Sequence, residues 1–332
     1  MVRTRGYTYQ TLCVLLLLLP AAFALSLAIG RVALPFSELL HGLAAPKPNL
    51  AWLILAELRI PRTVLALVVG ATLGLGGAAL QGLLRNPLAE PGLLGVSGGA
   101  ALGAVIAIYF GLATAFVLAI PLLGIAGALA AGALTFLFGR SGTLTLILAG
   151  AAVSGLAGAG LSLALNFAPS PYAAYEITTW LLGSVAERDW AQIALCMPFI
   201  LAGWLCLAFT PRGLDLLTLG EAQAESLGVN LSLLRAQVLA GVALSVGAAT
   251  AMAGAIGFVG LVAPHLVRPF VGHQPSRILL PSALFGALLL LVTDIAIRVL
   301  PTSNELKLGV LTSLIGTPFF FWLVLHLRRL SP

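Results

Sequence analysis

Few side chains in this sequence could do chemistry, and those few are charged residues set between long apolar runs. Asp294 is the clearest of them, because it lies inside an apolar run and four residues before Arg298. An acid in a membrane segment can bind and release a coupling ion. Two opposite charges four residues apart on a helix instead form an ion pair, and the spacing favours this second interpretation.

The sequence contains neither a nucleotide-binding loop nor a metal-binding cluster. Its two lysines, Lys47 and Lys307, do not follow glycine, so the Gly-Lys-Ser/Thr loop that holds nucleotide phosphates is missing. There is no HExxH motif, and the three cysteines lie in apolar runs without a CxxC pair. We therefore predict a protein that is not an enzyme and binds no metal or cofactor of its own. Its energy must come from a partner or from an ion gradient.

The composition is that of a membrane protein. Of the 332 residues, 60% are hydrophobic and 8% are charged, whereas soluble domains carry about 25% charged residues. The apolar runs are continuous and do not alternate, which indicates helices and not barrel strands. The 17 basic residues are scattered singly, so no nucleic-acid partner is predicted. The expected fold is all-α, a single transmembrane domain over residues 1–332 embedded in a lipid bilayer.

The apolar runs predict about ten crossings. The first could be a signal peptide cleaved after Ala22-Phe23-Ala24, but its length favours a retained helix. An even number of crossings puts both termini on the cytoplasmic side, with ten of the 17 basic residues, in agreement with the positive-inside bias. The expected crossings are 6–30, 63–84, two within 91–139, 143–167, 191–209, 236–252, a shorter helix ending near His265 or Arg268, 278–299 and 308–327. Between them lie polar segments at 31–58, at 168–190 (external, with a short helix at 177–182) and at 210–235 (cytoplasmic).

One stretch carries a family resemblance. RIPRT begins at Arg59, an uncharged run rich in small residues follows, and RNPLAEPGLLGVSGGA begins at Arg85. This sequence is similar, nearly residue for residue, to the more N-terminal signature motif of the FecCD family. Members of that family are the permease subunits of bacterial ABC importers for iron-siderophores, haem and cobalamin. The resemblance implies the type II ABC importer permease architecture. It also implies a homodimer, two ATP-binding cassette subunits that hold the ATP and magnesium, and a periplasmic substrate-binding protein.

The segment LGEAQAESLG resembles the part of the family that couples the permease to its ATPase. Its apolar residues could form a knob for a groove on the ATPase, with the two acids on a solvated rim. Its two glycines would end the short helices. An ordinary amphipathic loop helix is the alternative. The coupling residues implied are Leu219, Gly220, Glu221, Ala222, Ala224, Glu225, Leu227 and Gly228.

On the outer side, the resemblance implies that Arg59, Arg62 and Arg298 receive acidic residues of the binding protein. The planar guanidinium can grip a carboxylate with two hydrogen bonds. The alternative is that these arginines reach toward lipid headgroups from the helix ends.

The same resemblance places a cytoplasmic gate at Asn86, Leu88 and Thr143. Thr143 is followed here by Leu144, where the family has a second short polar residue, so the side chains of the gate differ. Asn86-Pro87 could also be no more than a turn.

Together these features predict a permease subunit of the bacterial inner membrane. With its ATPase it would move an iron(III)-siderophore, haem or cobalamin from a periplasmic binding protein to the cytoplasm. The alternative is a secondary transporter driven by an ion gradient, which would depend on Asp294.

Overall fold

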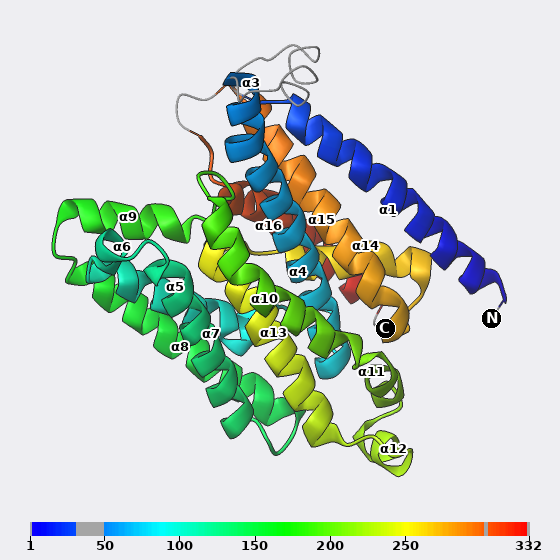
Figure 1. Ribbon diagram of the computed structural model, residues 1–332. Helices are drawn as coiled ribbons and strands as arrows, with labels where there is room; N and C mark the ends of the chain where they lie inside the picture. Colours follow the sequence, from blue (N-terminus) through cyan, green and yellow to red (C-terminus); the bar gives the residue numbers. More distant parts are fainter. Residues whose placement is uncertain (1, 31–49, 302–304, 331–332) are drawn as a thin grey trace.

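Helices make up all the regular structure of the described part of the chain. The computed structural model describes residues 2–30, 50–301 and 305–330, and Figure 1 shows them as one bundle of helices. The predicted all-α fold is therefore confirmed. Most of the polar segment predicted at 31–58 lies outside the described residues.

Seven described helical segments are long and apolar enough to cross a membrane, and with three shorter apolar helices they occupy the places of the predicted ten. The three shorter ones are α5 (Val96–Tyr109), α14 (Val259–Val271) and α16 (Leu308–Leu330), whose apolar part is Leu308–Leu323. The seven long ones are α1 (Val2–Ala28), the continuous segment of α3, η1 and α4 (Leu50–Leu84), α7 (Ala119–Phe138), α8 (Thr143–Asn166), α10 (Trp190–Ala208), α13 (Leu231–Ala253) and α15 (Pro275–Val299).

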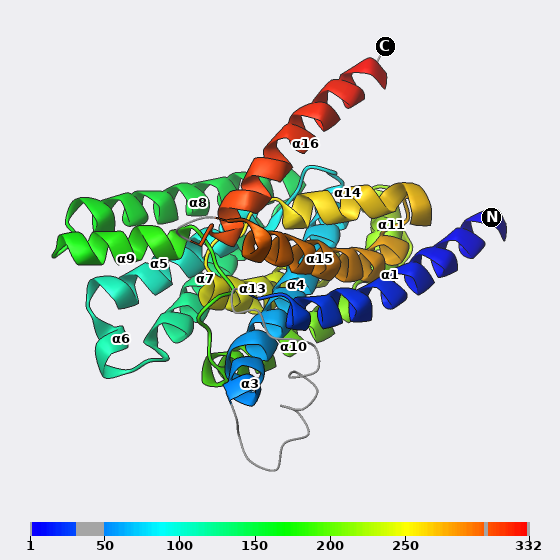
Figure 2. The same ribbon diagram turned by 90° about the horizontal axis from the view of Figure 1, so that it is seen from above.

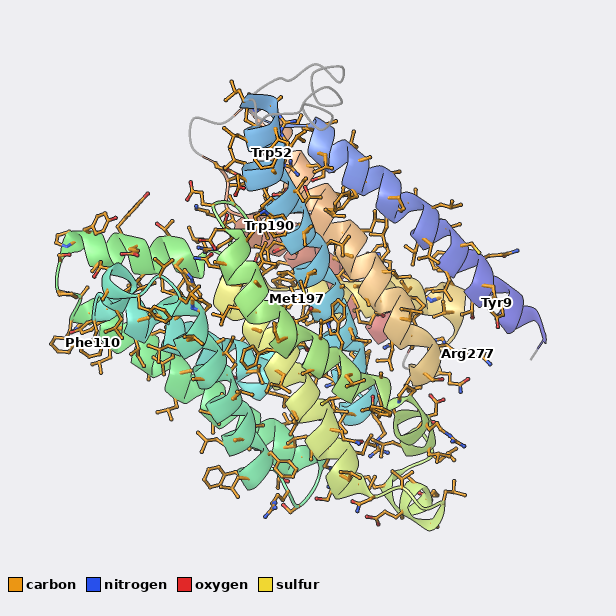
Figure 3. The ribbon with its side chains drawn as sticks, in the orientation of Figure 1. Tyr9, Trp52, Phe110, Trp190, Met197 and Arg277 are labelled. Carbon is orange, nitrogen blue, oxygen red and sulfur yellow. The ribbon has the colours of Figure 1, made fainter. Side chains whose placement is uncertain are left out.

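The bundle has two ends with different contents, here called the α3 end and the α12 end (Figure 1). The α3 end carries α3 (Leu50–Leu53), and the α12 end carries two short helices, α11 (Pro211–Leu217) and α12 (Glu221–Ser226). Trp52 and Trp190 both lie toward the α3 end (Figure 3), and tryptophans are enriched at membrane interfaces. The remaining short elements are η2 (Pro91–Leu94), α6 (Leu112–Ala115) and α9 (Pro171–Leu181).

Helix α4 (Ile60–Leu84) lies in the middle of the bundle, against α10, α13, α14 and α15 (Figures 1 and 2). Its glycines allow backbones to meet directly. A Cβ atom placed on Gly77 would overlap the carbonyl oxygen of Gly260 in α14, and one on Gly70 would overlap that of Gly286 in α15. Close approach at small residues is how helices pack in lipid, so the small-residue run serves the core.

Helix α9, helix α13 and the segment that contains α4 begin well before their predicted starts. Helix α9 begins at Pro171, where Ser170 accepts a hydrogen bond from the Ala173 amide at 3.1 Å; proline at the first helical position lacks only an amide that would be unpaired anyway. Helix α13 begins at residue 231, since Asn230 caps it in the same way through the Leu233 amide.

The third early start changes the setting of the RIPRT arginines. The helix predicted to begin at Thr63 is continuous from Leu50, with the π-helical turn η1 (Ile54–Arg59) before the regular turns of α4. Pro61 cannot donate to the carbonyl four residues before it, and the wide turn η1 precedes it. Arg59 and Arg62 therefore lie within a helical segment and not in a loop before it.

Candidate functional site

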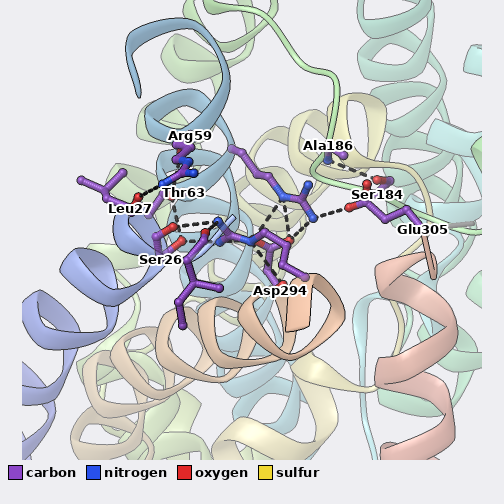
Figure 4. A network of polar contacts seen from close by, with 11 residues as sticks. Ser26, Leu27, Arg59, Thr63, Ser184, Ala186, Asp294 and Glu305 are labelled. Atoms are coloured by element: carbon purple, nitrogen blue, oxygen red, sulfur yellow. Dashed lines mark hydrogen bonds and ion pairs between the residues drawn. The ribbon is translucent and has the colours of Figure 1, made fainter. Parts of the chain in front are cut away.

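Asp294 is the centre of a buried ion-pair network at the α3 end (Figure 4). Its carboxylate is fully buried and accepts from Arg298 Nη2 at 2.6 Å, which confirms the ion pair predicted from the spacing. Arg62 binds the same carboxylate through Nε at 3.0 Å and Nη2 at 2.8 Å. Arg62 also pairs with Glu305. The partner from α4 was missed because it is 232 residues away in the sequence.

Arg59 and Arg298 cap the C-terminal end of α1. Arg59 Nη1 donates to the carbonyl oxygens of Leu27 and Ala28 at 2.7 and 3.0 Å. Arg298 Nη1 donates to the carbonyl oxygens of Ser26 and Ile29 at 2.7 and 2.8 Å. The last carbonyls of a helix have no partner inside it and carry partial negative charge. The two arginines therefore satisfy the end of α1 and fasten it to α4 and α15.

The structure brings the three arginines predicted for docking together at one end. Arg59 is 5% exposed and Arg298 is 8% exposed, so both are committed to contacts inside the chain. The side chain of Arg62 is 16% exposed. Of the three, Arg62 has the most surface to offer a partner.

A charged cavity of about 370 Å³ opens beside this network. Its lining includes the three arginines of the network, the turn Glu187-Arg188-Asp189, and the acids Glu57 and Glu305. Burial lowers the pKa of the Arg188 guanidinium, and its two acidic neighbours oppose that shift. Its Nε is buried without a hydrogen-bond partner among the described residues. Three consecutive charged residues in so apolar a chain were the sequence signal for this fourth arginine, which the predicted site did not include.

A second polar network, at the α12 end, joins the predicted coupling and gate residues. Thr143 Oγ1, at the start of α8, donates to Glu221 Oε1 in α12 at 2.7 Å. Arg235 Nη2, in α13, pairs with the other oxygen of Glu221 at 2.9 Å. Arg235 also donates to the backbone oxygen of Arg140, in the turn before α8. Three segments far apart in the sequence thus meet at one carboxylate.

These contacts hold Glu221 in its ionised form. Its pKa is lowered first by the hydrogen bond from Thr143, and then by Arg235 and the charge of Arg85, while partial burial opposes the shift. The carboxylate is therefore charged at neutral pH and binds as an anion.

The other two gate residues form a tight turn after α4. Asn86 Oδ1 accepts from the Leu88 amide at 2.9 Å, and the Asn86 carbonyl accepts from the Ala89 amide at 3.1 Å. Asparagine initiates such turns by bonding its own backbone two residues on, so Asn86-Pro87 does form a turn, as both the gate and the plain-turn interpretations require. Leu144, beside Thr143, is 70% exposed and presents an apolar side chain at the surface.

The predicted coupling residues divide into exposed and buried ones. Leu219 and Leu227 flank α12 and are 59% and 58% exposed. Ala224 lies within α12 but is fully buried, so it faces the chain's own core and adds nothing to an outer knob. Gly220 and Gly228 adopt positive φ angles of 112° and 87° just before and after α12, the conformation that glycine takes without strain.

The site does not suit an ion-coupled carrier. A coupling carboxylate must be able to take up and release its ion, whereas Asp294 is held by two guanidinium groups at 2.6 to 3.0 Å. No group of three or more acids, histidines or cysteines in the described part of the chain could hold a metal ion. Seven helices long enough to cross a membrane, three shorter apolar helices and polar networks at the two ends define a polytopic membrane protein.

Comparison with known proteins identifies the family to which this membrane protein belongs. The sequence profile of the FecCD transport family matches residues 16–326. The hemin transport system permease protein HmuU of Yersinia pestis is 38% identical over 323 residues, which are 95% of each chain. The vitamin B12 import system permease protein BtuC of Vibrio vulnificus is 39% identical over 324 residues, 95% of this chain and 94% of the relative. The solved structure of a metal-chelate type ABC transporter in an inward-facing conformation has a TM-score of 0.83 at 36% identity; the match covers 96% of this chain and 99% of that one.

The chain belongs to the FecCD transport family. It is the permease, the membrane-spanning subunit, of an ABC transporter, and ATP hydrolysis takes place on separate partner subunits. It is a multi-pass inner-membrane protein whose family implies ATPase and binding-protein partners.

Proposed function

We propose that this permease imports an iron(III)-siderophore, haem or cobalamin as a homodimer with two ATPase subunits. The support is the similarity across the chain to a haem permease and a cobalamin permease, together with the fold shared with a metal-chelate transporter. The α12 end faces the cytoplasm and the α3 end faces the periplasm, so both termini are cytoplasmic. ATP and magnesium are held by the ATPase subunits.

At the cytoplasmic end, α11 and α12 contact the ATPase, with Leu219 and Leu227 as the apolar anchors. The observation that carries this proposal is the bond between Thr143 and Glu221 at 2.7 Å. When the ATPases close and displace α12, this bond pulls on the start of α8. Thr143, Asn86 and Leu88 then open or close the inner mouth of the passage between the two copies.

At the periplasmic end, the binding protein docks over the charged cavity. Arg62 and Arg188 supply its positive charge, since both line the cavity and Arg188 has an unpaired buried Nε. Arg59 and Arg298 support this surface from inside, because they fasten the end of α1 to α4 and α15. An acidic side chain from the binding protein would find a guanidinium already in place.

Transport in proteoliposomes tests the proposal. Vesicles holding the permease with its ATPase, supplied with ATP and the loaded binding protein, should accumulate one of the three cargo classes. Vesicles without the ATPase should accumulate none. Uptake that needs no ATPase, or that follows an imposed proton or sodium gradient, would contradict the proposal.

A labelling experiment tests the orientation separately. Two single-cysteine variants are treated with a membrane-impermeant maleimide. Glu187→Cys should react in intact cells, whereas Glu225→Cys should react only after lysis. A cysteine-free background is obtained by replacing Cys13, Cys196 and Cys206. The reverse pattern would invert both proposed contact surfaces.

A further inference from the structure

A cavity of about 210 Å³ lies at the α12 end, where α4, α11, α14 and α15 meet. Its volume is several times that of a water molecule, roughly 30 Å³. Arg85, Arg268 and His273 line it together with the side-chain amides of Gln81 and Asn86, and its lining contains no acidic residue. Its two arginines therefore give the cavity a positive charge that no acid in its described lining offsets.

Arg268 is the residue whose charge lacks compensation. It lies in the last turn of α14, with its side chain half-buried. Nη2 donates to the neutral amide oxygen of Gln81 at 2.6 Å, while Nε is buried without a partner among the described residues. A buried guanidinium without a counter-ion is costly, and an unmade bond to a charged group adds to that cost. Arg268 has no counter-ion among the described residues, and its only hydrogen-bond acceptor there is a neutral amide.

Asp215 in α11 and Glu221 in α12 are engaged elsewhere, and Glu225, the other acid of α12, does not line the cavity. Asp215 accepts from the Ser276 amide at 2.8 Å and from Gln274 Nε2 at 2.7 Å, at the start of α15. Glu221 is held by Thr143 and Arg235. No ion pair within the described ranges includes Arg85 or Arg268. The described part of the chain therefore supplies no ion-pair partner for these two arginines, which leaves the cavity open to an anion from outside it.

We propose that this cavity binds a phosphate group, held between Arg268 and Arg85 with the Asn86 amide beside it. The guanidinium fork matches the oxygens of phosphate and binds it with charge-assisted hydrogen bonds. Asn86 Oδ1 already accepts from the Leu88 amide, so its NH₂ group remains to donate. The cavity lies where α4 and α14 end, so the phosphate comes either free from solution or as the headgroup of an anionic phospholipid. A ligand here would brace the turn that carries Asn86 against α14.

The test uses the full-length permease purified in an uncharged detergent and stripped of lipid. One arm titrates inorganic phosphate at constant ionic strength and follows the unfolding midpoint, which rises when a ligand binds the folded state. The other arm compares nanodiscs of phosphatidylcholine with nanodiscs that also contain phosphatidylglycerol. Native mass spectrometry counts bound phosphate or lipid in each.

Three variants make the test specific. Arg268→Gln removes the half-buried guanidinium, and Arg85→Asn removes the exposed one; asparagine tolerates the positive φ of that position. Each should weaken binding about tenfold or more, as expected for the loss of a bond to a charged group. Arg277→Gln is the matched control, because this arginine lies at the start of α15 near Tyr9 and outside the cavity (Figure 3). Arg85→Asn keeps the test valid if Arg268→Gln fails to fold.

Each outcome decides the matter. If free phosphate raises the unfolding midpoint of the parent chain and of Arg277→Gln but not that of the two cavity variants, the result would support a site for a free anion. The same pattern seen only with phosphatidylglycerol would support a headgroup site. No response in either arm, or an equal response in all variants, would overturn the proposal. So would variants that keep phosphate binding but lose the ATPase, since the cavity would then be a protein contact.

Discussion

Thr143 and Glu221 are 78 residues apart in the sequence, yet the hydroxyl of one donates to the carboxylate of the other at 2.7 Å. The bond joins the first residue of α8 to the first residue of α12. Arg235 holds the second carboxylate oxygen, so Glu221 is fixed from two sides. A displacement of α12 cannot leave the start of α8 unmoved while these bonds hold.

We predict that breaking this bond separates ATP hydrolysis from transport. Thr143→Val and Glu221→Gln should each lower the uptake per ATP hydrolysed by about threefold to tenfold, the range for one bond to a partly solvated charged group. The effects of the two changes should not add in full, because both act on one contact: valine removes the donor, and glutamine replaces the charged acceptor with a neutral one. Uptake and ATPase rates measured in the same proteoliposomes check this.

The matched control is Glu225→Gln, on the exposed face of the same helix. It should leave the ratio of uptake to hydrolysis unchanged. Equal losses in Glu225→Gln and Glu221→Gln would mean that charge on α12 matters in general and that the bond to Thr143 does not.

The same contact predicts a pH dependence. The folded-state pKa of Glu221 lies below its ordinary value of 4.5. A carboxyl group with a depressed folded pKa adds stability above the unfolded pKa, and this stability is lost as pH falls through the folded pKa. Thr143→Val should bring the pKa of Glu221 back toward 4.5. The unfolding midpoint of this variant should therefore depend less on pH below about pH 5 than that of the parent chain.

Unfolding midpoints from pH 7 down to about pH 3, below the ordinary pKa of the carboxyl group, measure this difference. Glu221→Gln, which cannot titrate, is the reference for the part of the curve that belongs to other groups. Parallel curves for the parent chain and for Thr143→Val would contradict the assigned cause of the shift.

How much the sequence could reveal differs between the fold and the site. The seven long spans were predictable because each contains an apolar run of about the length needed to cross a bilayer, and the three shorter apolar helices followed from the apolar runs between them. The partners of the arginines were not, because Arg59 caps a helix 32 residues earlier and Arg62 meets an acid 232 residues later. Local spacing revealed only the pair within one helix, Asp294 with Arg298.

A further prediction concerns Asp294, which neutralises two guanidinium groups. Asp294→Asn should destabilise the permease by about 3–5 kcal/mol, because removing one partner leaves buried charge uncompensated. Glu305→Gln should cost less, since Glu305 binds Arg62 alone and its side chain is 24% exposed. Thermal unfolding of both variants in detergent gives the comparison. An Asp294→Asn variant that unfolds like the parent but has lost transport would point instead to an ion-coupling role.

Helix packing gives another prediction. Gly77→Ala places a Cβ against the backbone oxygen of Gly260, which cannot move aside as a side chain could. The expected loss is about 1–3 kcal/mol, as for other overpacked cores, seen as a lower unfolding midpoint. Gly158→Ala on α8 is the control, since a Cβ there meets nothing within 4 Å. Equal midpoints for the two variants would show that α4 and α14 are further apart than the structure has them.

The last prediction tests the coupling surface. Leu219→Ser with Leu227→Ser removes the two exposed apolar side chains beside α12. Burying a leucine contributes about 1.5–3 kcal/mol, so losing both should weaken ATPase binding by roughly a hundredfold or more. Both positions are already exposed, and the isolated permease should therefore keep its unfolding midpoint. Leu53→Ser, an exposed leucine at the opposite end, is the control, and affinity of the purified ATPase for each variant in nanodiscs is the measurement. ATPase binding that survives the double change undiminished would remove α12 from the contact.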